Sequence, residues 1–221
     1  VGFIVIVLGL GELLEYFDPG IVPVAVFISV VGIWLVSLSV PDSASRHMSL
    51  NQVRLKSLLK RPEVIAFLAL CFLLQASHGP YYTFYTIYLE DYGYGRSLIG
   101  QLWALGVVAE IVIFLCMHHW LPRLGLRLVL LISLLLTALR WVLIAVFPEN
   151  LPMLIVAQAL HAASYGTYHA AAIAWVHRHF VGHNQGRGQA LYSSVSFGAG
   201  GAAGSLLSGY SWVIPGPQVT Y

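Results

Sequence analysis

The chain carries little charge for its length. Only 9% of its 221 residues are Asp, Glu, Lys or Arg, whereas a soluble domain carries about 25%. Hydrophobic residues make up 58% of the chain, and the mean hydropathy is +0.79. A soluble core could not bury so much apolar surface. The composition therefore predicts an all-α protein that crosses a membrane several times.

Cysteine is also scarce, and the motifs of common hydrolases are missing. Cys71 and Cys116 both lie in apolar spans, which argues against a disulfide framework and a zinc site. His177, His179 and His183 share one polar stretch without an acid or a cysteine, so we expect solvated side chains and no metal. The sequence contains no H-E-x-x-H, G-x-S-x-G or cysteine–histidine arrangement, and we expect no enzyme activity.

The chain lacks an initiator methionine and opens at Val1 inside a hydrophobic run. We interpret it as a fragment whose topology must be taken from its interior. Seven apolar spans are visible, and each complete span has the roughly 20 residues needed to cross a bilayer as a helix. A short amphipathic surface helix is predicted over Leu50 to Leu59. The seven spans are 1–14, 21–40, 64–89, 98–117, 128–147, 153–176 and 189–213.

Lysine and arginine gather in alternate loops. Nine of the eleven basic residues fall in loops 41–63, 118–127 and 177–187. By the positive-inside rule these loops are cytoplasmic and the polar tail 214–221 is external. The intervening loops hold Arg96 and the acids Glu15, Asp18, Glu90, Asp91 and Glu149.

The stretch from Gln75 to Leu89 is unusual for an apolar span. It contains a glutamine, a histidine, a Gly-Pro pair and five aromatic rings. Breakers and ionisable groups at mid-membrane depth are typical of the sites where carriers bind their cargo. We expect Gln75 and His78 to bind substrate, and Gly79-Pro80 to bend the helix at a gate.

The aromatic rings of this stretch have two interpretations. One is core packing, and the other is that Tyr81, Tyr82 or Tyr85 stacks on an aryl substrate. We expect both to hold, on different faces of the helix. Tyr88, with Tyr92 and Tyr94, is predicted to belong to an interfacial belt.

A motif of this stretch recurs later in the chain. Gln75-Ala76-Ser77-His78 is matched by Gln158-Ala159-Leu160-His161, and the two spans run in opposite directions. This indicates inverted three-helix repeats, the architecture of secondary transporters. We therefore expect cargo to bind between the two motifs, with Gln158 and His161 among its ligands.

Three motifs carry a family resemblance: the stretch Q-A-S-H-G-P-Y-Y-T-F-Y-T-I-Y-L from Gln75, L-W-A-L-G-V-V-A-E from Leu102, and G-R-G-Q-A-L-Y-S-S from Gly186. They resemble the 3-phenylpropionate permease family of the major facilitator superfamily, which is related to lactose permease and to nucleoside/proton symporters. The resemblance implies twelve helices in two six-helix halves and proton-coupled import across the bacterial inner membrane. The visible spans would be helices 5–11.

The same resemblance assigns the domains. Residues 1–40 would end the N-terminal half, residues 41–63 would form the loop between the halves, and residues 64–213 would form most of the C-terminal half. The tail after Trp212 does not resemble the family's last helix. The superfamily's loop signature survives in part as Arg123-x-Gly125-x-Arg127, but Pro122 stands where an acid is usual.

Ionisable groups within the apolar spans are the candidates for proton coupling, because a charge at mid-bilayer costs roughly 2.5–3.5 kcal/mol on insertion scales. At 1.5 Å per residue, Arg140 lies roughly 18 Å above the cytoplasmic end of its helix, level with His78 and His161. Glu110 and His169 form a lower layer, which a long arginine could bridge. We hypothesise that Glu110 titrates, paired with Arg140 or His169.

The resemblance to lactose permease bears on the same residues. Arg140 and His161 match its arginine and histidine of the ninth and tenth helices, but Ser164 stands where it has an acid. Separately, glycines including Gly200 and Gly204 have the small-x-x-x-small spacing of close helix contacts.

The sequence thus favours a proton-coupled importer of a small aromatic acid, driven by the proton gradient without a cofactor. We expect it to act as a monomer in the lipid bilayer and not to bind nucleic acid. Within transport, a sugar or nucleoside symporter or an efflux pump stays open. A seven-helix receptor and a membrane enzyme are the alternatives outside transport, and the inverted repeat argues against the receptor.

Overall fold

The computed structural model describes residues 2–16, 18, 20–39, 55–182, 184–214 and 216–221, and every regular element in these ranges is a helix. Residues 40–54, with the first half of the predicted surface helix, and His183 lie outside the described ranges, and α3 covers the second half. The first elements are α1 (Gly2–Tyr16), α2 (Ile21–Ser37), α3 (Leu55–Leu59), α4 (Pro62–Ser77), α5 (Gly79–Asp91), α6 (Arg96–Leu124) and α7 (Leu126–Val146). The remaining elements are α8 (Leu151–His161), η1 (Ala162–Gly166), α9 (Thr167–His179), α10 (Asn184–Ser193), η2 (Ser194–Gly200), α11 (Gly201–Val213) and α12 (Pro217–Thr220).

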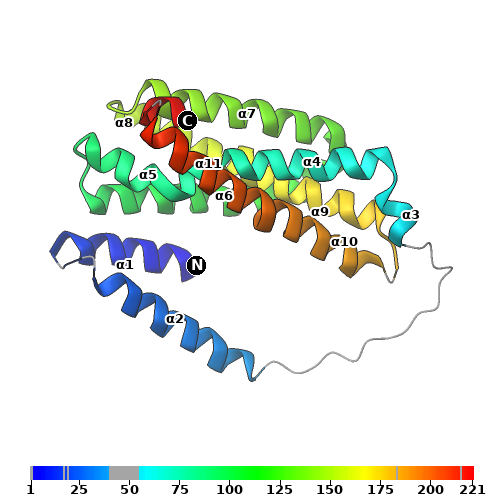
Figure 1. Cartoon of the computed structure of the whole chain (residues 1–221), viewed down its shortest axis with the longest axis horizontal. Helices are drawn as coiled ribbons and strands as arrows, with labels where there is room; N and C mark the ends of the chain where they lie inside the picture. The colour runs from blue at the N-terminus through cyan, green and yellow to red at the C-terminus, as the bar shows by residue number, and fades with distance from the viewer. Residues whose placement is uncertain (1, 17, 19, 40–54, 183, 215) are drawn as a thin grey trace.

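Most of the described helices form a bundle of five antiparallel rods (Figure 1). The rods are α4–α5, α6, α7, α8–η1–α9 and α10–η2–α11. The α8–η1–α9 rod packs against α6 and α7, while the α10–η2–α11 rod packs against α4, α5 and α9. The segments η1 and η2 are π-helical turns inside otherwise continuous helices. The bundle therefore brings the two Q-A-x-H motifs into one core.

The two N-terminal helices lie along one side of this bundle (Figure 1). Helix α1 packs on α6, where Gly11 approaches the backbone of Arg96 and Gly100. The described side chains of α2 are all at least partly exposed. An apolar helix without a buried face is typical of a surface that another helix or lipid covers.

Three stretches of the described chain are long and apolar enough to cross a membrane: 62–91, 96–124 and 126–146. Ile21–Ser37 is apolar but shorter. The π-helical turns divide the last two rods into α-helices of at most 13 residues. This shortens two of the seven predicted spans, whereas α1 with 15 residues and α2 with 17 residues are short without such a turn. Large apolar side chains face outward, as a lipid environment requires, and Leu135 is 71% exposed.

Two predicted loops are largely helical. The prediction that residues 118–127 form a loop is wrong, because α6 continues to Leu124. Gly125 alone separates α6 from α7. Gly125 has φ +78°, which glycine adopts without strain. Loop 177–187 is also mostly helix, since α9 ends at His179 and α10 begins at Asn184. A helix that leaves the membrane keeps its backbone hydrogen bonds and accepts polar side chains, so a polar stretch does not mark its end.

The C-terminal tail is not a free polar extension. Its short helix α12 folds back, and the Tyr221 hydroxyl donates to the Pro80 carbonyl over 3.3 Å. The predicted interfacial role of Tyr88 is also wrong. This ring is 1% exposed, and its hydroxyl donates to the Ile144 carbonyl. Tyr88 and Tyr221 pack together, with ring centroids 5.0 Å apart, so the tail helps to bury Tyr88.

Charge is distributed unevenly between the two ends of the bundle. We call one of them the basic end, made of α3, the end of α6, the start of α7, the end of α9 and the start of α10 (Figure 1). The opposite end carries Glu90, Asp91 and Glu149, with Arg96 paired to Glu90 at 2.7 Å. The described basic side chains of the basic end are Lys60, Arg61, Arg123, Arg127, Arg178 and Arg187.

Candidate functional site

Four helices bring polar and aromatic side chains together in the middle of the bundle, in a group we call the Arg140 cluster. His78 stands at the junction of α4 and α5, with Tyr81 and Tyr85 one and two turns later. Arg140 and Trp141 come from α7, and Gln158 and His161 come from the end of α8. All are buried. The structure thus places the two Q-A-x-H motifs beside each other, with the His78 and His161 rings 6.3 Å apart.

Arg140 is the central residue of this cluster. Its Nε donates to the Ala157 carbonyl over 3.1 Å, and its Cζ lies 4.0 Å from the Tyr81 ring centroid and 4.6 Å from that of Trp141. Aromatic faces attract a cation but do not neutralise it. Both terminal guanidinium nitrogens are buried without a hydrogen-bond partner among the described residues. Arg140 therefore presents an unneutralised positive charge to the cluster.

His78 presents a second unused nitrogen. Its Nδ1 lies 2.8 Å from the Leu74 carbonyl, and because a carbonyl only accepts, Nδ1 carries the proton. Its Nε2 is buried and has no hydrogen-bond partner within the described ranges. The His78 ring meets the Trp141 ring edge-on at 4.9 Å, so Trp141 contacts both His78 and Arg140. Neutral His78 therefore offers a lone pair, and the charged form would offer a hydrogen.

Tyr81 and Gln158 join the two motifs directly. The Tyr81 hydroxyl donates to Gln158 Oε1 over 2.9 Å, which leaves the Gln158 amide nitrogen without a partner. Gly106 of α6 creates the space for this contact. A Cβ at Gly106 would lie 3.1 Å from Gln158 Oε1 and 3.4 Å from His161 Cδ2. The lack of a side chain at position 106 thus lets α8 and its polar groups approach α6.

The Arg140 cluster has many unsatisfied polar atoms. Among the described residues, seven buried side-chain atoms have no hydrogen-bond partner in the protein, and six of them belong to this cluster. Buried polar groups are normally satisfied, and each exception needs an explanation. Donors and acceptors that converge without partners are the arrangement expected of a polar ligand site. The six atoms are His78 Nε2, Tyr85 Oη, Arg140 Nη1 and Nη2, Gln158 Nε2 and His161 Nδ1.

A column of stacked rings connects this cluster to the lower layer. The Tyr165 ring is nearly parallel to those of His161 and His169, with centroids 5.4 Å and 6.2 Å away. His169 Nδ1 lies 3.0 Å from the Tyr192 hydroxyl. Glu110 faces the same layer from α6, against Gly166. The aromatic ring of Tyr165 bridges the two layers, whereas the sequence suggested that an arginine would.

The predicted pairing of Glu110 is not observed. Within the described part of the chain the single ion pair is Arg96–Glu90, so Glu110 is paired with neither Arg140 nor His169. The reason is geometric. Arg140 extends toward the aromatic rings of α5, while Glu110 lies against η1.

Two partly exposed rings lie over the Arg140 cluster. Tyr82 is 46% exposed, and its ring centroid lies 6.2 Å from those of His78 and Trp103, with interplanar angles of 29° and 21°. The second ring is that of Tyr165, whose centroid also lies close to the His78 ring, at 5.8 Å. The predicted binding residue Tyr82 therefore separates the buried cluster from the exposed surface.

Gln75 and the glycines belong to a different contact, which we call the glycine contact. A Cβ at Gly204 would lie 2.2 Å from the Ala76 carbonyl oxygen, and one at Gly79 would lie 2.2 Å from the Gly204 carbonyl carbon. A Cβ at Gly200 would lie 3.3 Å from Gln75 Cβ. The close helix approach predicted from the glycine spacing is present here. Gln75, predicted to bind substrate, packs at this contact.

The sequence did not reveal three features of the site. Trp103 and Trp141 line the cluster, and tryptophans in an apolar span give no periodic signal that distinguishes a site from a core. The π-helical turn η1 follows His161 immediately, and such turns occur frequently at functional sites. The one signal for this turn in the sequence is that four of its five residues, A-A-S-Y-G, are small. Helices deform most easily where side chains are small.

Comparisons with known proteins agree with this architecture. The MFS_1 like family matches residues 1–221. The probable 3-phenylpropionic acid transporter of Escherichia coli (strain K12) is 38% identical over 148 residues, covering 65% of this chain. The chain spans 38% of that relative's length. No solved structure matches. Because the family covers the whole chain, the protein belongs to the MFS_1 like family of the major facilitator superfamily.

Proposed function

We propose that the protein is part of a proton-coupled importer of a small aromatic carboxylate, such as 3-phenylpropionate, in a bacterial inner membrane. The observation that carries this proposal is Arg140, a buried guanidinium set among aromatic rings, with no anionic partner in the part of the chain that the structure describes. The name of the E. coli relative supports the same substrate class.

The carboxylate is the part of the substrate that Arg140 would bind. A guanidinium binds a carboxylate through two parallel hydrogen bonds, and both terminal nitrogens of Arg140 are unused. An unneutralised charge inside a membrane bundle is expensive, so it is retained where it serves a ligand. The nearby amide nitrogen of Gln158 would donate a further hydrogen bond to the anion.

The aromatic ring of the substrate would pack against the rings around Arg140. The Tyr81 and Trp141 rings face the guanidinium, and Trp103 packs on Tyr81 with ring centroids 4.4 Å apart. Offset and edge-to-face pairs of aromatic rings contribute about 0.5–1.5 kcal/mol beyond their buried area. Tyr82 and Tyr165 cover the cluster and would have to move aside for the substrate to enter.

Proton coupling follows from the state of His78. Neutral His78 has its lone pair on Nε2, which repels a carboxylate, whereas the protonated ring donates to it. Binding of the anion and of a proton would therefore favour each other. The stacked column of His161, Tyr165 and His169 leads from this histidine pair to Glu110, which we propose takes up the proton in the lower layer.

The test is uptake by the protein reconstituted in proteoliposomes, with and without a proton gradient. The substrates are radiolabelled 3-phenylpropionate, its neutral amide, and uridine. We expect gradient-driven uptake of the acid alone. Uptake of uridine without the acid would support the nucleoside symporter instead. Gradient-independent uptake of the acid would refute coupling but leave the substrate assignment intact.

Glu110→Gln separates coupling from binding. We expect this variant to lose gradient-driven accumulation while it still exchanges labelled for unlabelled acid, because the amide cannot release a proton. Glu90→Gln is the matched control, since this acid lies at the opposite end and pairs with Arg96. Full accumulation by Glu110→Gln would show that another residue carries the proton.

A further inference from the structure

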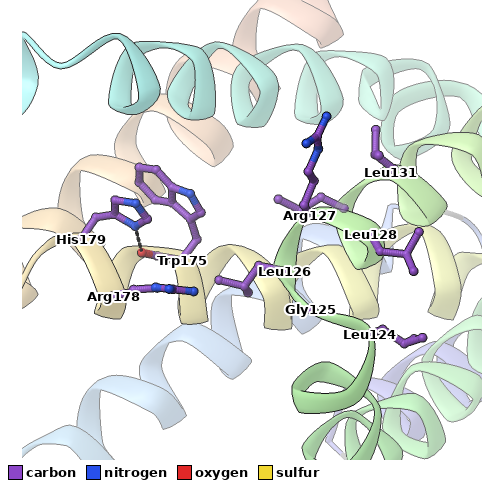
Figure 2. A pocket seen from close by; sticks show the side chains of 10 residues that line it. Leu124, Gly125, Leu126, Arg127, Leu128, Leu131, Trp175, Arg178 and His179 are labelled. Carbon is purple, nitrogen blue, oxygen red and sulfur yellow. Dashed lines mark hydrogen bonds between the residues drawn. The ribbon is translucent and has the colours of Figure 1, made fainter.

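A pocket at the basic end lies far from the Arg140 cluster. It has a volume of about 840 Å³ and opens between the α6–α7 junction and the last turns of α9 (Figure 2). Leu124, Leu126 and Leu128 line the side formed by α6 and α7, and Trp175 with His179 lines the side formed by α9. The proposed transport function uses none of these residues.

Two arginines stand on opposite walls of this pocket. Arg127 extends from the start of α7, and Arg178 extends from α9 toward Leu126 (Figure 2). Both side chains are exposed, and neither forms an ion pair or hydrogen bond with a described residue. No acidic side chain is among the described residues that line the pocket. The pocket therefore presents two uncompensated positive charges.

Apart from His179 the remaining lining is apolar, and ring stacking holds Trp175 in place. Trp175 is sandwiched between Phe67 and His179, with centroids 3.9 Å and 3.7 Å away and nearly parallel planes. Leu128 and Leu131 are 45% and 49% exposed on the outer surface of the bundle. Tryptophan at such a position is typical of the membrane–water interface. The pocket thus combines a cationic rim with an apolar wall.

We propose that this pocket binds an anionic phospholipid, such as phosphatidylglycerol. Arg127 and Arg178 would contact the headgroup phosphate, and the leucines would contact the first part of an acyl chain. Basic pockets between transmembrane helices on the cytoplasmic side bind anionic headgroups in this way. A soluble anion would use the arginines but leave the leucines in water.

Native mass spectrometry of the purified protein in detergent tests this proposal. The probes are phosphatidylglycerol and phosphatidylcholine of the same acyl composition, titrated separately. The test variant is Arg127→Gln/Arg178→Gln. The matched control is Arg123→Gln/Arg187→Gln, which removes the same charge from the same end but outside the pocket lining. All four side chains are exposed, so the bundle core is unchanged, and thermal unfolding verifies this.

We expect the protein to prefer phosphatidylglycerol and the test variant to bind it about 25-fold more weakly, about five-fold for each arginine. The control variant should lose less than two-fold in its affinity for phosphatidylglycerol. Equal losses in both variants would show general surface attraction and overturn the proposal. No loss in either variant, displacement of the lipid by inorganic phosphate, or a dimer whose interface excludes the lipid would overturn it as well.

Discussion

The Arg140 cluster and the glycine contact are adjacent on the same rod but have opposite character. His78 and Tyr81 face the cluster, while Gly79 between them faces the backbone of α11. At the glycine contact the helix backbones touch and leave no room for a methyl group. At the cluster the side chains are buried, but their hydrogen-bonding capacity is unused. One region is organised for close packing, the other for a polar ligand.

This difference indicates how the rod serves both purposes. A helix that ends and restarts at His78 can present consecutive residues in different directions. The close contact through Gly79 and Gly204 fixes the position of the break. The unsatisfied groups of the cluster are then held where they cannot relax to find partners within the bundle. The close packing at the glycine contact thus keeps the polar groups of the Arg140 cluster in place.

The largest effect is expected from a methyl group at the glycine contact. In Gly204→Ala the new Cβ would lie 2.2 Å from the Ala76 carbonyl oxygen, so the backbones must separate. We expect the free energy of unfolding to fall by about 3 kcal/mol, measured by thermal unfolding in detergent. Gly209→Ala in the same helix is the control, because its Cβ would meet nothing within 4 Å. A stability equal to that of the control would contradict the close contact.

Removing the charge of the cluster should have the opposite effect on stability. Arg140→Met fills a similar volume without a buried charge, and such replacements are often neutral or stabilising. We expect unchanged or higher thermal stability but about 100-fold weaker binding of 3-phenylpropionate, measured by equilibrium dialysis. The control is Arg96→Met, which breaks the partly exposed pair with Glu90. It should change thermal stability and substrate binding only slightly. A marked loss of stability in Arg140→Met would mean that Arg140 holds the bundle together.

A smaller effect on substrate binding is expected at Gly106, where a close helix approach lies beside the polar groups of the Arg140 cluster. The Cβ of Gly106→Ala would approach Gln158 Oε1 to 3.1 Å, so the amide must shift by a few tenths of an ångström. We expect about five-fold weaker substrate binding with unfolding changed by less than about 1 kcal/mol. Gly198→Ala, which meets nothing within 4 Å, is the control. Unchanged binding would separate Gln158 from the substrate site.

Much of the fold could be predicted from local patterns. Apolar spans bounded by charged or Pro-Gly segments identified most helices, because apolar length and breakers are local properties. The helix ends were predicted less well, as α6 shows by continuing through His118 and His119 to Leu124. Those residues are polar, but a helix projecting into the headgroup region has no need of apolar side chains.

The sequence predicted most residues of the candidate site, but not which of them contact one another. His78, Tyr81, Gln158 and His161 do meet, as the repeated motif suggested. Gln75 belongs to the same motif, yet it packs at the glycine contact. Three residues along a helix rotate a side chain by about 300°, so the direction in which each member points depends on how the rods are packed.

The sequence alone determined that this protein is a helical membrane protein, that its basic residues gather at one end, and which ionisable groups lie within its apolar spans. These properties depend on residue type and order. Only the tertiary structure decided that Arg140 faces aromatic rings while Glu110 lies against η1, and that Tyr165 joins the two layers. The physical reason is that π-helical turns and glycine contacts set the rotation and approach of each rod. A charge finds or lacks a partner according to those distances.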